Sequence, residues 1–167
     1  GDGPFTYQWL HDGVAMPGET NDTLFLNSLT LPDAGAYTTI VTNAYGVDTS
    51  NQTLVSVNAL PPATATNTGP YCEGETIQLN SVGGSATDDW AGPLAYSATD
   101  TQNPTIASST VAMSGLYTVT VTNGAGCTST STTNVIVNGN PPPSATNTGP
   151  YCEGETIQLN SVGGSAT

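Results

Sequence analysis

Reactive side chains are scarce in this sequence, and the first of them is its single histidine, His11. An imidazole can act as the base for a serine or cysteine nucleophile only within hydrogen-bond reach of it. His11 precedes Asp12 and Gly13, a pair typical of a tight hairpin turn, so we expect a solvated turn residue. Residues 61–139 contain no histidine at all. A hydrolytic triad is not supported, and we predict no catalytic residue and no enzyme activity.

Acidic residues form close pairs that could bind a cation. Glu73 with Glu75, and Asp88 with Asp89, could ligate calcium at a domain junction together with backbone carbonyls. Their spacing fits no defined calcium loop, so solvated charge is the favoured interpretation. A glycosidase with two carboxylates would also need a cleft, which thin β-domains rarely provide. We accordingly predict no metal site and no cofactor.

The charge balance excludes two classes of partner. The chain has no Lys or Arg against 13 acidic residues, which makes the formal net charge −13 and the pI about 4.1. Nucleic acids and anionic membrane surfaces are bound through Lys and Arg, so we expect neither as a partner. No apolar run approaches the roughly 20 residues that cross a bilayer, and no signal peptide opens the chain at Gly1. We expect an internal or mature segment without membrane insertion.

An internal repeat predicts the domain organisation. The segment ATNTGPYCEGETIQLNSVGGSAT ends at Thr87 and again at Thr167, an offset of 80 residues (167 − 87). This period is too long for a solenoid unit and suits one small β-sandwich. Prolines at 61–62 and 141–143 precede the two copies and predict short, stiff linkers.

Alternating side chains predict the strands. In residues 117–122 (YTVTVT) apolar residues alternate with threonine, which is typical of a strand with one buried face. Residues 76–79 and 134–137 predict two further strands, and no apolar period of 3.6 residues indicates a helix. The expected fold class is all-β.

Two aromatic residues and a short motif carry a family resemblance. Residues 5–9 (FTYQW) predict a strand ending in Trp9, and Asp33, Gly35 and Tyr37 follow in a D-x-G-x-Y motif. This combination resembles the immunoglobulin fold, in which a buried tryptophan lies on strand C and the tyrosine forms a corner at the start of strand F. The resemblance implies that Trp9 and Tyr37 define the core.

The same plan recurs further along the chain with Trp90 and Tyr117, which the resemblance makes core residues of a second unit. Antibody domains carry a cysteine two residues after the corner tyrosine, and Thr39 and Val119 stand there in this chain. The antibody disulfide is therefore absent. This departure favours bacterial immunoglobulin-like repeats, in which an apolar core replaces that bridge.

Cysteines offer a different bridge. On the immunoglobulin plan Cys72 lies just before strand B and Cys127 just after strand F, and we predict that they form a disulfide. Such a bridge would contribute about 4 kcal/mol on the chain-entropy model and would place the protein outside the cytoplasm. The alternative is two buried free thiols, and metal binding by three widely spaced cysteines is disfavoured.

The Y-C-x-G-x-T opening and the late G-C-T of residues 61–139 resemble repeats of large surface proteins of Bacteroidota. Asp22, Thr23 and Leu24 match the short pattern that such proteins use for O-glycosylation, so Thr23 is a candidate site.

The resemblance divides the chain into three parts. Residues 1–60 would be an immunoglobulin-like domain that lacks strands A and B, residues 61–139 a complete domain, and residues 140–167 the A and B strands of a further domain. The chain would then be either a window of a long periodic protein or a subunit that completes its neighbour by strand donation.

The cysteines favour the window. Val47 aligns with Cys127, so a hybrid of the first and last parts would leave Cys152 without a partner. In either case the open strand edges predict aggregation or polymerisation of the isolated chain.

We therefore predict tandem immunoglobulin-like antiparallel β-sandwiches joined by short Pro-rich linkers, acting as an acidic extracellular filament or stalk at the cell surface. The expected partners are neighbouring repeats or subunits of the same protein, with glycans or a host or surface ligand at a distal tip. The alternative is a glycan-binding accessory module of a secreted multidomain protein, with Tyr45, Tyr71 and Tyr96 as the stacking surface.

Overall fold

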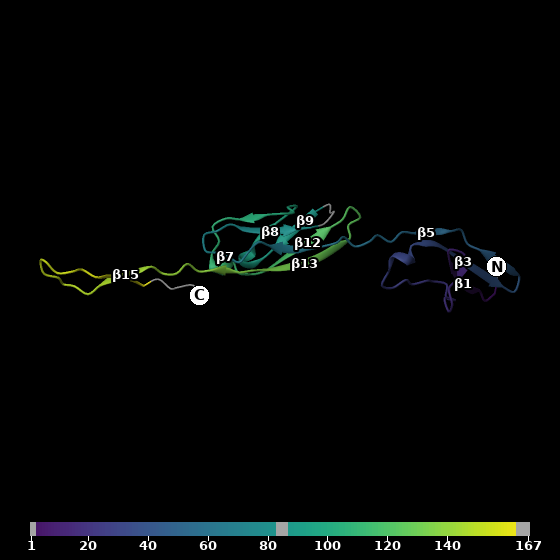
Figure 1. Cartoon of the computed structure of the whole chain (residues 1–167). Helices are drawn as coiled ribbons and strands as arrows, with labels where there is room; N and C mark the ends of the chain where they lie inside the picture. Colours follow the sequence, from purple (N-terminus) through teal and green to yellow (C-terminus); the bar gives the residue numbers. More distant parts are fainter. Residues whose placement is uncertain (1–2, 83–86, 163–167) are drawn as a thin grey trace. The chain divides into compact units, whose positions relative to one another are not determined.

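The computed structural model describes residues 3–82 and 87–162, and nearly all of its regular structure is β-strand (Figure 1). Three short 3-10 turns are the only helical elements of these residues, and none of them is long and apolar enough to cross a membrane. Contacts between residues divide the chain into two units, Gly1–Leu60 and Pro61–Thr167. The all-β class predicted from the sequence is confirmed.

The first unit contains a single antiparallel sheet within its described residues, 3–60. Its long strands are β1 (Thr6–His11) and β3 (Gly35–Asn43), which pair with each other. After β1 the chain turns at Asp12 and Gly13, whose φ angles of 48° and 80° lie in the left-handed region that such a hairpin requires. Strands β2 (Val14–Ala15), β4 (Gly46–Thr49) and β5 (Thr53–Val55) complete the sheet, in the order β2-β1-β3-β4 with β5 also on β3.

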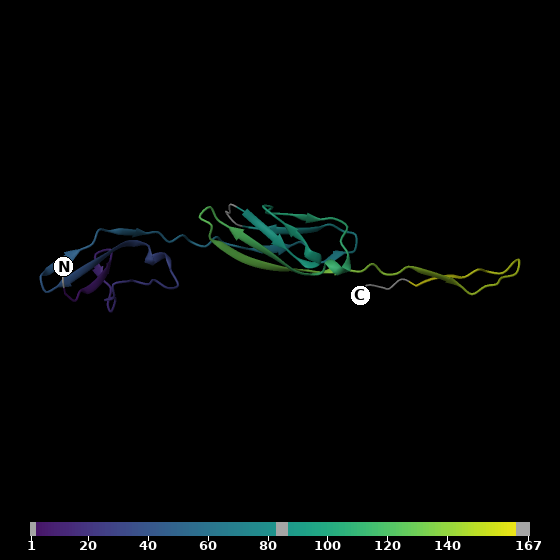
Figure 2. The ribbon, with the colours of Figure 1, turned by 180° about the vertical axis from the view of Figure 1, so that it is seen from behind.

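Residues 61–139 of the second unit form two sheets that pack face to face (Figures 1 and 2). One sheet has the order β10-β9-β12-β13 and the other β11-β8-β6, while β7 and β14 form a short parallel pair. Residues 83–86, between β8 and β9, lie outside the described residues. The strands are β6 (Ala65–Asn67), β7 (Tyr71–Cys72), β8 (Ile77–Ser81), β9 (Thr87–Ala91), β10 (Ser97–Ala98), β11 (Thr105–Ile106), β12 (Gly115–Thr122), β13 (Thr128–Val135) and β14 (Val137–Asn138).

Strand β12 begins at a corner that Tyr117 stabilises. The Tyr117 phenol donates a hydrogen bond of 3.0 Å to the carbonyl oxygen of Met113, four residues upstream, at the end of the 3-10 turn η3 (Val111–Met113). This is the tyrosine corner of immunoglobulin domains. One sheet then contains strands A, B and E (β6, β8, β11) and the other C′, C, F and G (β10, β9, β12, β13). Residues 61–139 therefore form an immunoglobulin-like sandwich.

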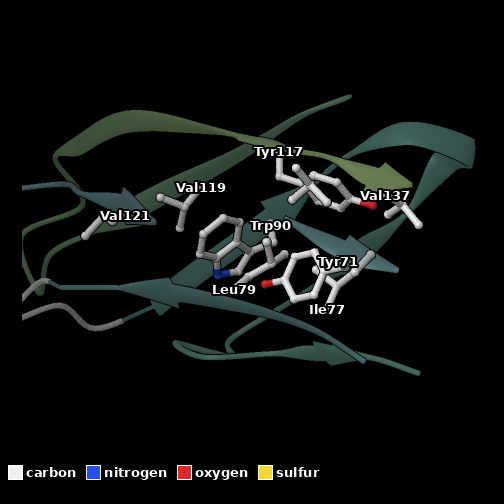
Figure 3. Close-up of a cluster of buried hydrophobic side chains, with 9 residues drawn as sticks. Tyr71, Ile77, Leu79, Trp90, Tyr117, Val119, Val121 and Val137 are labelled. Carbon is white, nitrogen blue, oxygen red and sulfur yellow. The ribbon is translucent and has the colours of Figure 1, made fainter. Parts of the chain in front are cut away.

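The core of this sandwich follows from side-chain alternation. In β12 Tyr117, Val119 and Val121 are at most 1% exposed, and the threonines between them point to the other face. Ile77 and Leu79 of β8 meet them from the facing sheet, and both are fully buried (Figure 3). Burying each such side chain contributes about 1.5–3 kcal/mol. The core comprises Tyr71, Ile77, Leu79, Trp90, Tyr117, Val119, Val121, Val135 and Val137.

The chain continues into a separate two-stranded hairpin, β15 (Ser144–Asn147) with β16 (Leu159–Val162). Its register pairs Ala145 with Ser161 and Asn147 with Leu159. The pairing of β6 with β8 has the same register 80 residues earlier, Ala65 with Ser81 and Asn67 with Leu79. The repeated sequence thus forms the same hairpin in both places.

The predicted disulfide between Cys72 and Cys127 is wrong. Both residues are described, and no bond joins them. Cys72 pairs with Asn138 beyond the end of β13, whereas Cys127 precedes its first residue, Thr128. The seven residue steps of β13 alone span about 23 Å, and a disulfide requires Cα atoms within about 7 Å. Strands B and F run in the same direction in the two sheets, so the start of one and the end of the other lie at opposite ends of the domain.

Candidate functional site: an open sheet face and an open hairpin

His11 is not a solvated turn residue, contrary to the expectation from its neighbours. It is the last residue of β1, it is half-buried, and its ring stacks on Tyr37 at a centroid distance of 4.6 Å with 12° between the planes. Its Nε2 lies 3.2 Å from the carbonyl oxygen of Ala34 and 3.5 Å from Oδ2 of Asp12. Contacts on the face and edge of the ring make His11 part of the packing at this corner.

The acidic pairs do not converge on a cation site. Asp88 is buried and Asp89 is exposed, because successive residues of β9 point to opposite faces of the sheet. Oε2 of Glu75 accepts a hydrogen bond of 2.7 Å from the backbone N–H of Cys72, which stabilises a local turn. Over residues 3–82 and 87–162, no group of three or more His, Cys, Asp or Glu side chains could hold a metal ion.

The proposed aromatic stacking surface is not formed. Tyr71 is only 5% exposed, and its hydroxyl accepts hydrogen bonds from the backbone N–H groups of Thr68 (3.0 Å) and Gln78 (3.1 Å). Tyr96 is half-buried and meets Tyr117 edge-on at 5.6 Å, and burial raises the pKa of both of these phenols. Of the three predicted residues only Tyr45, which is 81% exposed, presents its ring to solvent.

Thr23, the candidate glycosylation residue, lies in the exposed segment between β2 and β3. Its hydroxyl donates a hydrogen bond of 3.2 Å to Oδ1 of the neighbouring Asp22.

The tryptophan and tyrosine of the first unit make the same local contacts as those of the second. Each indole N–H donates to a backbone carbonyl twelve residues along the chain, from Trp9 to Asn21 at 3.0 Å and from Trp90 to Gln102 at 3.3 Å. The Tyr37 phenol donates a hydrogen bond of 2.8 Å to a carbonyl four residues upstream, as Tyr117 does. The sheet of residues 5–57 is therefore equivalent to the C′-C-F-G sheet of the sandwich.

One face of this sheet is open. In the sandwich, the corresponding face is covered by β6 and β8 and its side chains are at most 3% exposed. Among the described hydrophobic residues of the first unit only Tyr37, at 4% exposure, is comparably buried. The half-buried residues and their buried counterparts are Trp9 and Trp90, Thr39 and Val119, Val41 and Val121, Val55 and Val135, and Val57 and Val137. Towards one end the face is hollowed by about 280 Å³ beside Val41, Phe5 and Tyr45.

A segment that would be strand E in the first unit is not a strand. In the sandwich, β11 pairs only with β8, in a register that places Thr105 opposite Gln78 and Ile106 opposite Ile77. Counting 80 residues back gives Phe25 and Leu26, which are irregular in structure. Phe25 is 76% exposed and Leu26 half-buried, the same alternation as Thr105 and Ile106. Without a strand like β8 beside it, this segment lacks the partner that makes β11 a strand.

The C-terminal hairpin is open on the complementary side. Ile157 is 60% and Leu159 74% exposed, although their counterparts Ile77 and Leu79 are fully buried. The hairpin nevertheless keeps the internal contacts of its counterpart. The Tyr151 hydroxyl accepts from the backbone N–H of Thr148 at 3.1 Å and donates to the carbonyl of Gln158 at 3.3 Å. Oε2 of Glu155 accepts from the backbone N–H of Cys152 at 2.7 Å.

The sandwich shows how such a hairpin is held. Asn67 Nδ2 donates to the Thr133 hydroxyl at 2.8 Å and to the Asn134 carbonyl at 3.0 Å. The backbone N–H of Tyr71 donates to the Ile136 carbonyl at 2.9 Å. On the other side, Leu79 donates through its backbone N–H to the Pro104 carbonyl at 3.1 Å. The hairpin is therefore anchored by strand G on one side and by strand E on the other, with its apolar face on the core.

Sequence reasoning identified Trp9 and Tyr37 but missed that Thr39 belongs to the same face and that Phe25 lies in the segment corresponding to strand E. The available signal for Thr39 was that it alternates, two residues apart, with Tyr37 and Val41. Phe25 gave no such signal, because a strand that depends on a distant partner leaves a weak local pattern.

The sequence matches no protein-family model and no curated protein. The structure is similar to several solved structures of immunoglobulin domains. It resembles an amphioxus IgVJ-C2 molecule (22% identity, TM-score 0.40, 79% of this chain and 88% of that one). It also resembles the N-terminal four Ig domains of Dscam1 isoform 1.9, with 15% identity and a TM-score of 0.38 over 80% of this chain and 37% of that one. A third similar structure is that of the Sidekick-1 immunoglobulin domains 1–4, with 15% identity and a TM-score of 0.35 over 98% of this chain and 50% of that one. This chain thus spans half or less of the length of the latter two structures. Identities and TM-scores are low, so the immunoglobulin-like assignment depends on the sheet order and tyrosine corner of residues 61–139.

Proposed function

We propose that this chain is a structural segment of an extracellular filament or stalk, built from immunoglobulin-like units in tandem. The observation that supports this role is the sealed core of residues 61–139. Trp90, Tyr117 and Leu79 are at most 2% exposed between the two sheets, so the domain offers a rigid block rather than a binding cleft. Two hollows on this domain, which are lined by aromatic or proline residues, are small, with volumes of about 150 and 170 Å³.

The domain organisation supports the same role. Residues 1–60 supply a C-F-G-type sheet, residues 61–139 a complete sandwich, and residues 140–167 an A-B-type hairpin, so the two halves of one structural plan each occur twice along the chain. The partners are then neighbouring units of the same protein, and a distal tip would carry any glycan or host-surface ligand. A net charge of −13 without Lys or Arg suits a surface protein of the Bacteroidota type, in which Thr23 would be O-glycosylated.

Electron microscopy of the native material tests the stalk. We expect a beaded filament whose axial period corresponds to one domain. Compact, isolated particles that bind oligosaccharides on a glycan array would contradict the stalk and would favour the glycan-binding module.

A further inference from the structure

We propose that a disulfide bond joins successive units of this protein across their junction. Cys72 of the sandwich would bond to the cysteine that stands at the position of Cys127 in the unit that follows along the chain. The inference deepens the structural role proposed above and rests on its tandem arrangement. The partner is the next repeat of the same protein, and the bond would stiffen the junction between the two units.

Cys72 lies at the end of the sandwich from which the chain leaves (Figure 1). Its strand β7 pairs in parallel with β14, the last strand of the sandwich, so that Cys72 stands opposite Asn138. The backbone N–H of Glu73 donates to the Asn138 carbonyl at 2.9 Å, and Nδ2 of Asn140 donates to the Glu73 carbonyl at 3.2 Å. The turn that carries Cys72 therefore contacts the departing chain as far as the residue before the proline run.

Cys127 lies at the opposite end of the sandwich, in the turn between β12 and β13. Strands β7 and β14 follow β6 and β13 along the chain and pair in parallel, so β6 and β13 run in the same direction. Nδ2 of Asn67 in β6 donates to the Thr133 hydroxyl of β13. Six residues before these two stand Pro61 and Cys127. Cys127 therefore lies at the end where the chain enters the sandwich.

The repeat brings these two ends to one junction. Pro141 is the counterpart of Pro61 at the offset of 80 residues (141 − 61), and it directly follows Asn140, whose side chain contacts the turn of Cys72. One peptide unit, about 3.8 Å between Cα atoms, separates this contact from the entry residue of the next unit. A disulfide allows up to about 7 Å between its Cα atoms. In a tandem, the exit-end thiol of one unit and the entry-end thiol of the next would therefore meet.

Hydrogen bonds fix the backbone at both cysteines. The N–H of Cys72 donates to Oε2 of Glu75 at 2.7 Å, and its carbonyl accepts from Oγ of Ser109 at 3.1 Å. The N–H of Cys127 donates to Oδ1 of Asn123 at 3.0 Å. Cys72 is exposed and Cys127 half-buried, so neither belongs to the sealed core. A bond between two turns that are already formed costs little further ordering.

Formation of the bond requires an oxidant from outside the chain, and a low-molecular-weight disulfide suffices. The two thiols lose two protons and two electrons and form one S–S bond, while the external disulfide takes up both and becomes two thiols. Oxidising conditions of this kind persist outside the cytoplasm, in agreement with the proposed surface location.

A chain of two units tests the proposal, because residues 61–139 form a complete sandwich with its own core. It consists of residues 61–167 followed directly by residues 88–139. Thr167 then takes the place of Thr87, so the natural linker is kept and the second unit is completed.

This two-unit chain contains four cysteines: Cys72 and Cys127 in its first unit, and Cys152 and a second Cys127 in its second. After equilibration with reduced and oxidised glutathione and denaturation, we expect two of these four thiols to react with a thiol reagent. The single sandwich of residues 61–140 should keep both of its thiols reactive. Four reactive thiols in the two-unit chain would overturn the proposal. So would none, which would mean one bond within each unit.

Valine substitutions in the two units provide a matched control. Valine already stands at this position as Val47 in the sheet of residues 5–57, so the substitution should not prevent folding. Cys127→Val in the second unit removes the proposed partner of Cys72, and all three remaining thiols should react. The same substitution in the first unit should leave the bond intact and only the Cys152 thiol reactive. Equal thiol counts in the two variants would contradict the proposal.

Failure here and failure of the stalk are distinguishable. Four reactive thiols together with beaded filaments of the native material would refute the bond and leave the tandem stalk intact. Two reactive thiols together with compact native particles would refute the stalk instead.

Discussion

The sheet of residues 5–57 and the sandwich of residues 61–139 share one plan, yet they differ in what covers their inner face. Trp9 and Trp90 make equivalent hydrogen bonds through their indole N–H groups, and both tyrosine corners are formed. Only Trp90 is buried, at 2% exposure. The hairpins and the corner are thus local structures of strands C, F and G, whereas the core requires the A-B hairpin. The hairpin of residues 144–162 shows the converse, because it keeps its shape without a core to cover.

The largest expected difference in stability is between substitutions of Leu79 and Leu159, the same leucine in the two copies of the repeat. We expect Leu79→Ala to lower the free energy of unfolding of the sandwich by about 2–5 kcal/mol, because it empties space in a closed core. Leu159→Ala, at a position 74% exposed, should change it by less than about 0.5 kcal/mol. Urea unfolding followed by Trp90 fluorescence in a Trp9→Phe background measures both. Similar losses in the two variants would show that the hairpin packs like its counterpart in the isolated chain.

A glycine distinguishes the corners of the two units. A Cβ added at Gly92 would overlap the ring of Tyr117, whereas the corresponding residue of the first unit is His11, which stacks on Tyr37 instead. Gly92→Ala should therefore destabilise the sandwich by about 1–3 kcal/mol through overpacking. The same urea titration measures it. Gly124→Ala is the control, since a Cβ there would meet nothing within 4 Å. Equal stability of both variants would mean that Tyr117 can move aside.

Replacing Thr39 by valine, the residue type of its buried counterpart, should stabilise the first unit. The Thr39 hydroxyl is buried and has no hydrogen-bond partner in the described structure, and Val119 occupies the equivalent position. Thr39→Val should raise the stability of the first unit by about 1 kcal/mol, since it removes an unsatisfied polar group at nearly constant volume. Trp9 fluorescence in a Trp90→Phe background, at protein concentrations too low for association, gives the measurement. A loss of stability would show that the hydroxyl binds water on this face.

Acid should affect the first corner more than the second. Hydrogen bonds from the Thr30 hydroxyl (2.6 Å) and backbone N–H (2.7 Å) hold the pKa of Asp33 below its ordinary value of 3.8. A lowered pKa stabilises the fold above the ordinary value, and this contribution is lost as the pH falls through the lowered pKa, below about pH 4. The sandwich carries Met113 at this position, which cannot titrate.

The expected result is a Trp9 unfolding midpoint that falls more steeply below pH 4 than that of Asp33→Asn. The Trp90 midpoint serves as the internal control and should not respond to this substitution. Parallel pH profiles of the wild type and Asp33→Asn would rule out the contribution of this carboxylate.

Sequence reasoning predicted the strands well where alternation is strict. The pattern at residues 117–122 corresponds to β12 (Gly115–Thr122), and the strand predicted at residues 5–9 corresponds to β1 (Thr6–His11). It predicted less about the candidate site, because residues 24–26 and 144–162 matter through surfaces that only a folded partner defines. In the sandwich, the equivalent segments and the partners that cover them belong to the same domain.

The order of residues alone determined the all-β class, the tyrosine corner and the repeat of 80 residues, because alternation, D-x-G-x-Y spacing and sequence identity are local properties. Tertiary structure decided that Cys72 and Cys127 lie at opposite ends of the domain, that Tyr71 is inside it, and that His11 packs on Tyr37. It also decided that Leu79 is buried and its identical counterpart Leu159 exposed. The physical reason is that burial and proximity depend on which sheet faces a strand and in which direction each strand runs, and neither is encoded in the strand's own sequence.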